Sequence, residues 1–236
     1  MVVKLVTITW SYSNNYDIEN TFLYKSFIKN NSLSNFIHIH YDRNNYASLE
    51  YDFYSKYDYQ FEYILYKLYL TRDKIESLDA DYFVFADAND VVCLGDINTL
   101  PLVDEILVSS EINQYPIVHM NFNNLDYTND EKENKHFLNS GVFLTSKSNY
   151  IKLLDNIKNN ILKNHLKSFY GDQGVLVYHY LSNHTPKIML DKESKIFLNT
   201  YNRKHEDYIG YNFPMFVHDN GWRYDSPKFI EKFNLV

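Results

Sequence analysis

Short apolar runs rich in β-branched and aromatic residues alternate along the chain with segments whose apolar residues recur at helical spacing. Apolar runs of this kind, bounded by Asn, Asp, Ser and Gly, predict β-strands. The predicted strands are Val2 to Thr9, Phe36 to Tyr41, Tyr82 to Ala86, Ile117 to Met120, Val142 to Thr145, Lys187 to Leu190 and Met215 to Val217. The alternation of the two patterns predicts an α/β domain in which helices connect the strands.

Helical periodicity is clearest in residues 61–68 and 150–161, and a shorter apolar stretch of helical character covers residues 175–181. Ser226-Pro227 predicts the start of a terminal helix, with Ser as the cap and Pro at the first helical position. Because the predicted strands are almost continuously apolar, we expect a largely parallel sheet that is covered on both faces. Ligands bind beyond the carboxyl ends of the strands in such sheets, so the residues just after each strand are the candidates for function.

The length of 236 residues and a hydrophobic content of 45% allow a substantial core. No repeat, linker or charge block marks a boundary, and we therefore expect a single domain over residues 1–236. The formal net charge of −7 disfavours nucleic acid as a partner, since nucleic acids are held by clustered Lys and Arg. An acidic protein still binds a diphosphate if a divalent cation lies between its carboxylates and the phosphates.

Cys93 is the only cysteine and lies in an apolar run, where it is expected to be a small buried side chain. No internal disulfide can form, which favours a reducing compartment. The first residues lack an apolar segment long enough for a signal peptide, and no later segment approaches the length of a membrane span. We therefore expect a cytoplasmic protein without a membrane span.

The six glycines exclude several common enzyme classes. No pair has the spacing of a dinucleotide-binding Gly-x-Gly-x-x-Gly turn, and no Walker A loop is present. A Gly-x-Ser-x-Gly nucleophile elbow, a His-Glu-x-x-His pair and a cysteine-based metal site are also missing from the sequence.

The strongest local pattern is the apolar run Tyr82 to Ala86, which ends directly in Asp87 and, three residues later, Asp90. A strand end followed by a tight turn can direct two carboxylates at one point, and oxygen ligands favour Mg²⁺ or Mn²⁺ over softer metals. The alternative is an ordinary turn that closes a strand, which Asp and Asn favour without any metal.

Three further segments place polar residues beside a strand or a helix. His218 follows an apolar strand and would complete a metal site, although a lone histidine is more often structural. Leu138 to Gly141 form a polar turn that enters a strand, and Asp172 precedes the apolar stretch 175–181, where Asp is commonly only a helix cap. Five of the six glycines lie in or near these four segments, which favours a functional interpretation of the four together.

Taken in order, these segments resemble the glycosyltransferase domain of the multifunctional collagen lysyl hydroxylases and its viral and collagen-glycosyltransferase relatives. The shared elements are a strand ending in Asp-x-x-Asp, a Leu-Asn-Ser-Gly turn, an Asp-Gln pair at a helix start, a Leu-Asp-x-x-Ser-x-Ile-Phe-x-Asn stretch and a late His-x-Asn-Gly. Here they are Asp87 to Asp90, Leu138 to Gly141, Asp172-Gln173, Leu190 to Asn199 and His218 to Gly221. The resemblance covers nearly the whole chain.

The resemblance implies a GT-A fold and a Mn²⁺ or Mg²⁺ ion held by Asp87, Asp90 and His218, with the cation bridging the diphosphate of a UDP-sugar. Asp172 is the implied catalytic residue, in contact with the sugar or the attacking hydroxyl. The residues implied to bind the nucleotide sugar are Thr9 and Ser11 near the uridine, together with Asn89, Asn139, Gln173, Asn220 and Gly221.

Three positions depart from the family pattern. The family has acidic residues before Gln, whereas this chain has Tyr170-Gly171-Asp172, which puts donor choice and rate in question. Asn89 stands where relatives carry an aromatic residue beside the nucleotide. Asp219 replaces the first glycine of the His-Gly-Asn-Gly form, where a carboxylate would either add to the metal site or repel the diphosphate.

The sequence thus predicts a metal-dependent transferase that moves a hexose, glucose or galactose, from a UDP-sugar to an acceptor hydroxyl. Acceptors implied by the resemblance are collagen-like hydroxylysine, a glycan or a small molecule. Two alternatives stay open: an inactive nucleotide-sugar-binding or interaction module with the same fold, and a nucleotidyltransferase that would release pyrophosphate instead of UDP.

Overall fold

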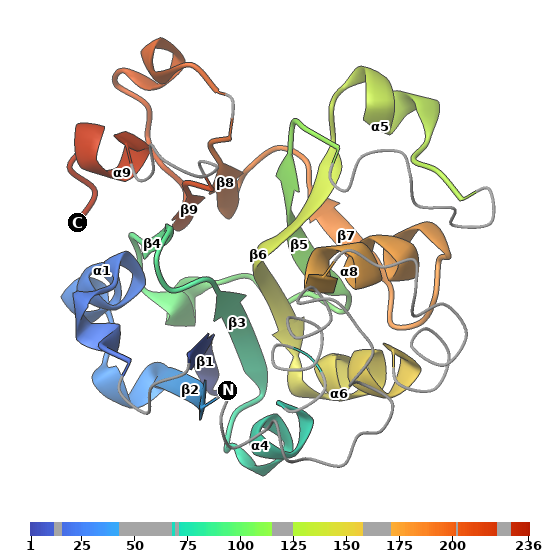
Figure 1. The fold of residues 1–236 in the computed structure, drawn as a ribbon, viewed down its shortest axis with the longest axis horizontal. Helices are drawn as coiled ribbons and strands as arrows, with labels where there is room; N and C mark the ends of the chain where they lie inside the picture. Colours follow the sequence, from blue (N-terminus) through green and yellow to red (C-terminus); the bar gives the residue numbers. More distant parts are fainter. Residues whose placement is uncertain are drawn as a thin grey trace.

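The computed structural model describes residues 1–11, 16–42, 68, 71–114, 125–157, 171–201, 203–220 and 228–236. Its centre is a six-stranded sheet in the order β2-β1-β3-β6-β5-β7 (Figure 1). These strands are β1 (Val3–Ser11), β2 (Phe36–Asp42), β3 (Tyr82–Ala86), β5 (Ile106–Glu111), β6 (Phe137–Ser146) and β7 (Ile188–Asp191). A smaller sheet, β4-β9-β8, is built from β4 (Val91–Cys93), β9 (Phe216–His218) and β8 (Phe197–Asn199).

The main sheet is mostly parallel, as predicted, with one strand reversed. β1 pairs in parallel with β2 and β3, and β5 pairs in parallel with β7. β6 runs antiparallel to both of its neighbours, β3 and β5. The alternation of apolar residues has the same period in both strand directions, so the sequence pattern could not show this reversal.

Helices cover both faces of the sheet. The described helices are α1 (Phe22–Asn30), α4 (Arg72–Ser77), α5 (Asn129–Glu133), α6 (Lys147–Asn156), α8 (Gly171–Leu181) and α9 (Lys228–Lys232), with short 3-10 turns η1 (Ile18–Asn20), η2 (Leu33–Asn35), η4 (Ile97–Thr99) and η7 (His205–Tyr208). None of the helices within the described ranges is both long and apolar enough to cross a membrane.

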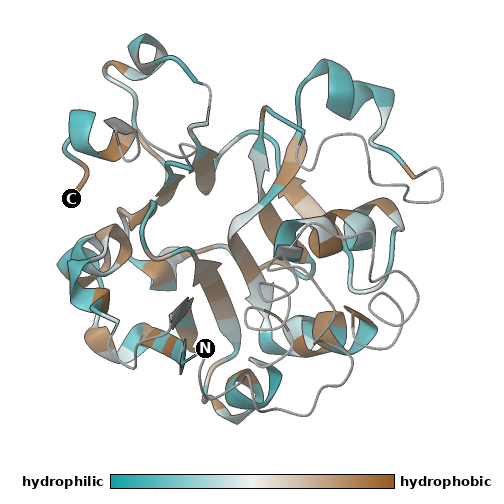
Figure 2. Cartoon of the chain, viewed as in Figure 1, coloured by the Kyte–Doolittle hydropathy of each residue, from teal (hydrophilic) through white to brown (hydrophobic). Residues whose placement is uncertain are grey.

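The alternating side chains of β3 show how the two faces are filled. Phe83 and Phe85 pack in one apolar cluster with the buried faces of α4, α6 and α8. Val84 and Ala86 point the other way, into a second cluster with α1 and the small sheet. In Figure 2 most of β3 has the colour of hydrophobic residues, whereas most of α5 is hydrophilic. Burial on both faces explains why this strand reads as a continuous apolar run.

Most predicted elements occur within a few residues of their expected places. The predicted strand Ile117 to Met120 lies outside the described residues, as do most of the 61–68 segment and Ser226-Pro227. Residues 150–156 of the predicted 150–161 helix belong to α6, which begins earlier because Ser146 caps it by accepting a hydrogen bond from the Asn149 amide, and residues 158–161 lie outside the described ranges. The strands β4, β5 and β8 were not predicted, since β4 and β8 have three residues each and β5 ends in the polar sequence Ser-Ser-Glu.

His179, on the buried face of α8, provides a test of this packing through the pH dependence of stability. Its side chain is fully buried, and its Nε2 lies 2.7 Å from the carbonyl oxygen of Pro186. Burial lowers the pKa of His179 to about 4, although the hydrogen bond to Pro186 favours the charged form. The contribution of neutral His179 to the free energy of unfolding should therefore be fully present above about pH 6.5. As the pH falls toward 4, the unfolded chain binds a proton that the folded protein does not, and the free energy of unfolding should decrease by about 3 kcal/mol.

Urea unfolding between pH 7 and pH 4 measures this effect. The His179→Gln variant keeps an N–H donor for Pro186 but cannot titrate, so its stability should fall less steeply with acid. The half-buried His184, in the connection that follows α8, gives the comparison: its charge is only the last of the causes that act on the pKa of His179, so His184→Gln should keep most of the wild-type slope. An unchanged acid slope in His179→Gln would contradict the prediction.

Candidate metal centre and its surroundings

The small sheet brings together the three predicted metal ligands. Asp87 and Asp90 lie in the turn between β3 and β4, and His218 ends β9. β4 and β9 are antiparallel, with Val91 opposite His218, and the Asp219 amide donates a 2.7 Å hydrogen bond to the Asp90 carbonyl. One ligand atom from each residue of the triad lies within 4.8 Å of the others. Residues 87–90 and 218, far apart in the sequence, thus meet at a single point.

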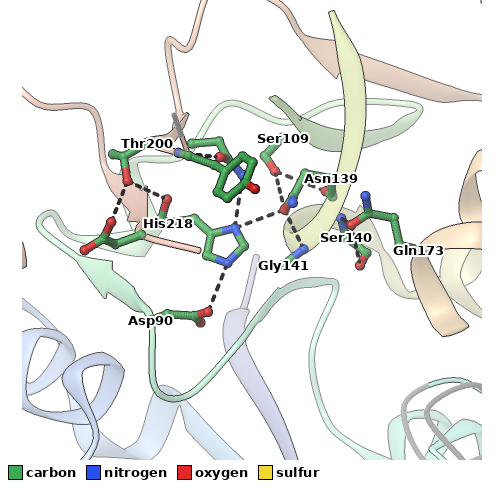
Figure 3. Close-up of polar contacts among 11 residues, drawn as sticks. Asp90, Ser109, Asn139, Ser140, Gly141, Gln173, Thr200 and His218 are labelled. Carbon is green, nitrogen blue, oxygen red and sulfur yellow. Dashed lines mark hydrogen bonds and ion pairs between the residues drawn. The ribbon is translucent and has the colours of Figure 1, made fainter. Parts of the chain in front are cut away.

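Asn139 orients the imidazole of His218. Its Oδ1 lies 3.0 Å from His218 Nδ1, while the Asn199 side-chain nitrogen lies farther away, at 3.3 Å. Because the Asn139 oxygen can only accept, the shorter contact places a proton on Nδ1. Figure 3 shows the ring between Asn139 on one side and Asp90 on the other.

The other ring nitrogen of His218 is buried and has no hydrogen-bond partner among the described residues. Its nearest carboxylate oxygen, Asp90 Oδ2, is 3.5 Å away, which is long for a hydrogen bond. A histidine that binds a metal through one nitrogen usually donates a hydrogen bond through the other. His218 has this arrangement, with Nδ1 satisfied by Asn139 and Nε2 left for a ligand.

The charges around His218 favour a cation. Burial alone would lower the pKa of His218, but the carboxylates of Asp90, Asp87 and Glu111 outweigh it and raise the pKa. Glu111 was not predicted from the sequence. It is buried at the end of β5, and burial raises its pKa, partly offset by hydrogen bonds from Gln173 and Asn139. Carboxylates gathered around one imidazole provide both the ligand atoms and the negative potential that a divalent cation requires.

Gly141 makes room for the imidazole. A Cβ atom at this position would lie 2.0 Å from His218 Cε1 and 2.5 Å from Nδ1. Two hydrogen bonds also hold the backbone of Gly141 in place. Its amide donates to Asn139 Oδ1 at 2.9 Å, and its carbonyl accepts from the Asp87 amide at 2.9 Å. The Leu-Asn-Ser-Gly turn predicted from the sequence is in fact part of β6, and its glycine and asparagine support the metal ligands.

Gln173 and Asp172 begin α8 beside this strand. Gln173 Oε1 accepts a hydrogen bond from the Ser140 amide at 3.1 Å, and its Nε2 donates to Glu111 at 2.8 Å. Asp172 lines a small cavity of about 20 Å³ together with Asp87 and Ser140. The predicted catalytic carboxylate therefore lines the same cavity as Asp87, the first of the predicted metal ligands, whereas Gln173 ties α8 to β5 and β6.

Thr9 and Ser11 form a separate polar group with two histidines at the carboxyl ends of β1 and β2. The Thr9 hydroxyl lies 2.7 Å from His38 Nε2 and 2.8 Å from His40 Nδ1. Since a hydroxyl has one proton, at least one of these histidines donates to it. Ser11 Oγ lies 3.4 Å from His40 Nε2. Burial and the neighbouring His40 lower the pKa of His38 to about 4, so this histidine is neutral at pH 7.

Tyr16 links this group to Asn89. Its hydroxyl donates to Asn89 Oδ1 at 2.9 Å, and its ring lies against His40 with centroids 5.8 Å apart. Tyr16 therefore places an aromatic ring next to position 89, where this chain has Asn in place of the aromatic residue of the relatives. His38 and His40 of β2 were not predicted as site residues, because the sequence His-Ile-His is typical of an ordinary alternating strand.

The remaining predicted residues lie at the end of β9. Asn220 is half-buried, and its Oδ1 has no hydrogen-bond partner within the described ranges, while Gly221 lies outside them. In the Leu190 to Asn199 stretch, Asp191 accepts hydrogen bonds from the amides of Ile196 and Phe197 at 2.7 and 2.9 Å. This part of the motif closes a turn, and only its last residue, Asn199, reaches His218.

Asp219 has a structural position outside the triad. Its Oδ1 accepts from the Thr200 hydroxyl at 2.8 Å, and its Oδ2 accepts from the amides of Phe229 and Ile230, at the start of α9. The two roles considered from the sequence, an added metal ligand or repulsion of a diphosphate, both place this carboxylate at the metal. The contacts instead turn it toward α9.

Asp219→Ala should therefore lower the free energy of unfolding by about 2 to 4 kcal/mol, because several buried donors lose a charged acceptor. Chemical denaturation measures this loss. Binding of Mn²⁺ by the folded variant should stay within about threefold of the wild type, a difference of less than 1 kcal/mol. A variant of normal stability with impaired Mn²⁺ binding would reverse the assignment.

No protein-family model matches the sequence, and no curated protein is a significant match. Many solved structures are similar in fold, among them two glycosyltransferases. One is a glycosyltransferase involved in the glycosylation of the major capsid of PBCV-1, with a TM-score of 0.54, 12% identity and coverage of 99% of this chain and 100% of that one. The other is the galactosyltransferase LgtC in complex with donor and acceptor sugar analogs, with a TM-score of 0.53, 13% identity and coverage of 98% and 94%.

Both similarities extend over nearly the full length of each chain, and both proteins are glycosyltransferases. Identities this low establish the fold and leave the relationship to the lysyl hydroxylases as a prediction. The mixed sheet, the helices on both of its faces and these neighbours agree with the fold predicted from the sequence. The chain has the GT-A glycosyltransferase fold.

Proposed function

We propose that this protein is a metal-dependent glycosyltransferase that transfers a hexose from a UDP-sugar to an acceptor hydroxyl. The observation that carries the proposal is the triad of Asp87, Asp90 and His218, whose ligand atoms lie within 4.8 Å of one another and include a buried, unpartnered imidazole nitrogen. The fold adds support, since one of the similar structures is a galactosyltransferase with donor and acceptor sugar analogs.

The donor set fits Mn²⁺ or Mg²⁺, because two carboxylates provide hard oxygen ligands and one imidazole provides the third position. Asp87, Asp90 and His218 would hold the ion, which when bound supplies positive charge to stabilise the developing charge on the UDP leaving group. Asn139 keeps the His218 lone pair directed at the ion by accepting the Nδ1 proton. The side-chain exposure of 31% for Asp90 leaves this carboxylate accessible to a ligand.

The remaining residues divide into two groups around the triad. Thr9, Ser11 and Tyr16 lie on the β1 side, where they would contact the uridine, and Tyr16 would supply the aromatic surface that Asn89 lacks. Asp172 lies on the α8 side, next to the small cavity it shares with Asp87, and would contact the sugar or the attacking hydroxyl. Unchanged transfer rates in Asp172→Asn would remove Asp172 from the chemistry.

Thermal unfolding with UDP, GDP and ADP, each with and without Mn²⁺, tests the proposal. A ligand at about 100 times its Kd adds about 2.7 kcal/mol of stability, which corresponds to roughly 5 to 10 °C for a protein of this size. We expect this shift for UDP with Mn²⁺ and a smaller one, or none, for the other nucleotides.

Incubation with UDP-glucose and UDP-galactose then separates the competing functions. Release of UDP from these donors supports a transferase. In a parallel incubation with UTP and a sugar phosphate, release of pyrophosphate would instead identify a nucleotidyltransferase. Binding of UDP without release of sugar under any condition would identify an inactive nucleotide-sugar-binding module. Absence of a shift with every nucleotide would overturn the proposed function.

A further inference from the structure

A second pocket is lined by the turn that follows α5, the turn between β7 and β8, and the segment around η7. Its volume is about 410 Å³, within the range that small-molecule sites occupy. Its lining includes Ile112, Lys135, Leu198, Arg203 and Tyr211. None of these residues has a part in the proposed donor site.

The lining is cationic in a protein whose net charge is −7. Lys192 is paired with the buried Glu131 at 3.3 Å, and Glu193, the acidic residue of the lining, is paired with a neighbouring lysine at 2.7 Å. Lys135 and Arg203 have no carboxylate within ion-pair distance in the part of the chain that the structure describes. These two cations leave the pocket with uncompensated positive charge.

Arg203 has the hydrogen-bonding capacity for an anionic ligand. Its Nη1 donates to the Tyr208 hydroxyl at 3.0 Å, which holds the half-buried side chain in place. Its Nε is buried and has no hydrogen-bond partner among the described residues. An unsatisfied buried donor is costly, and the planar fork of Arg matches the two oxygens of a carboxylate or phosphate.

Next to these cations, the pocket has surfaces suited to a sugar ring. Tyr211 is 41% exposed, and its ring is supported edge-on by Tyr208 at a centroid distance of 5.1 Å. Leu198 and Ile112 contribute further apolar lining. A sugar ring has apolar C–H faces and a polar edge, which an aromatic side chain with a hydroxyl can match on both counts.

The pocket borders the polar network of the metal centre. Ile112 directly follows Glu111, and Leu198 directly precedes Asn199, so each is one peptide unit, about 3.8 Å between Cα atoms, from a residue of that network. β8, which carries Leu198, also packs against β5, which ends directly before Ile112. A ligand in the pocket therefore lies next to the backbone that carries this network.

We infer that this pocket binds a saccharide bearing a carboxylate or phosphate group, and that this anionic saccharide is the acceptor. The inference of a binding site stands on the pocket itself, whereas the acceptor role rests on the proposed function. Arg203 and Lys135 hold the anionic group, and Tyr211 packs against the sugar ring.

Titration calorimetry with methyl β-D-glucuronide, methyl β-D-glucoside and inorganic phosphate tests the site. We expect the glucuronide to bind at least about tenfold more tightly than the neutral glucoside, and its affinity to fall as NaCl is added. Equal affinity for the two glycosides would overturn the anionic specificity. Phosphate binding as tight as that of the glucuronide would overturn the saccharide part of the inference.

Substitutions assign the binding to the pocket. Arg203→Gln should weaken glucuronide binding by about 10- to 100-fold, and the exposed Lys135→Gln by about threefold, because each loses a charge-assisted contact. Lys132→Gln, which removes a cation from α5 outside the lining, should leave the affinity within about twofold. If Arg203→Gln folds poorly, Lys135→Gln alone decides, and unchanged affinity in the folded variants would overturn the site.

A final titration separates the pocket from the donor site. Glucuronide should bind with the same affinity to the protein saturated with UDP and Mn²⁺, since the two sites are distinct. Displacement of UDP by glucuronide would overturn the acceptor role. Glucuronide binding without any UDP binding would support the saccharide site and reject the proposed function. UDP binding without glucuronide binding would reject the saccharide site alone.

Discussion

Asp87→Asn is expected to eliminate the Mn²⁺-dependent stabilisation by UDP and to reduce sugar transfer by about 10²- to 10³-fold. The substitution keeps the size and shape of the side chain but removes one of the two carboxylates of the triad. An amide oxygen is a weaker ligand than a carboxylate oxygen, and the charge on the leaving group would lose part of its compensation. Asp90→Asn should have an effect of the same order.

The measurement is the thermal shift with UDP and Mn²⁺, followed by a UDP-release assay. Asp96→Asn, in the next connection along the chain, is a matched control, because Asp96 caps η4 by accepting a hydrogen bond from the Asn98 amide, and Asn caps helices as well as Asp does. It should keep both the shift and the activity. A full UDP shift in Asp87→Asn would exclude Asp87 as a metal ligand, whatever the activity.

The metal triad could be predicted because each of its members directly follows an apolar strand. Asp87 and Asp90 come after β3, and His218 ends β9, so the pattern alone placed all three at strand ends. The pairing of β4 with β9, which brings them together, could not be predicted, because β4 has only three residues. The sequence indicated the candidate ligands, and only the fold shows that Asp87, Asp90 and His218 lie close together.

Residues that support the site were harder to identify because their sequence patterns have ordinary explanations. Glu111 ends a strand whose second half is polar, and a strand register shift between Val108 and Ser109 directs this half toward Asn139. Arg203 follows a polar stretch with no periodicity. Asp219 shows the opposite error: its place next to His218 suggested a role at the metal, but its oxygens accept hydrogen bonds from α9.

Gly141 belongs to a segment that was predicted to be functional, but the sequence did not show what the glycine does. The structure gives the reason: a methyl group here would lie 2.0 Å from His218 Cε1, 2.5 Å from Nδ1 and 2.7 Å from Nε2. His218 is buried and held by Asn139, so its ring cannot swing aside freely. Gly141→Ala should therefore displace the imidazole and eliminate Mn²⁺-dependent UDP binding, with a loss of about 1 to 3 kcal/mol in the free energy of unfolding.

Two other glycines provide controls for the two separate costs of adding a methyl group. At Gly95 the new Cβ would meet only the flexible Met215 side chain at 3.4 Å, so Gly95→Ala should change stability by less than about 1 kcal/mol. At Gly210 nothing lies within 4 Å, but φ is +75°, and Gly210→Ala should cost about 1 kcal/mol of backbone strain. Both variants should keep the full UDP shift.

A double variant tests whether the collision with His218 is the cause. In Gly141→Ala/His218→Ala the imidazole that the methyl group would strike is gone, so the two losses of stability should not add. The free energy of unfolding lost in the double variant should be smaller than the sum of the two single losses by about 1 kcal/mol or more. UDP binding should stay independent of Mn²⁺ in the double variant, because a metal ligand is missing. Additive losses would mean that Gly141 serves the backbone of β6 instead of making space for the imidazole, and the tight packing of ring against glycine would then have no part in positioning the metal ligand.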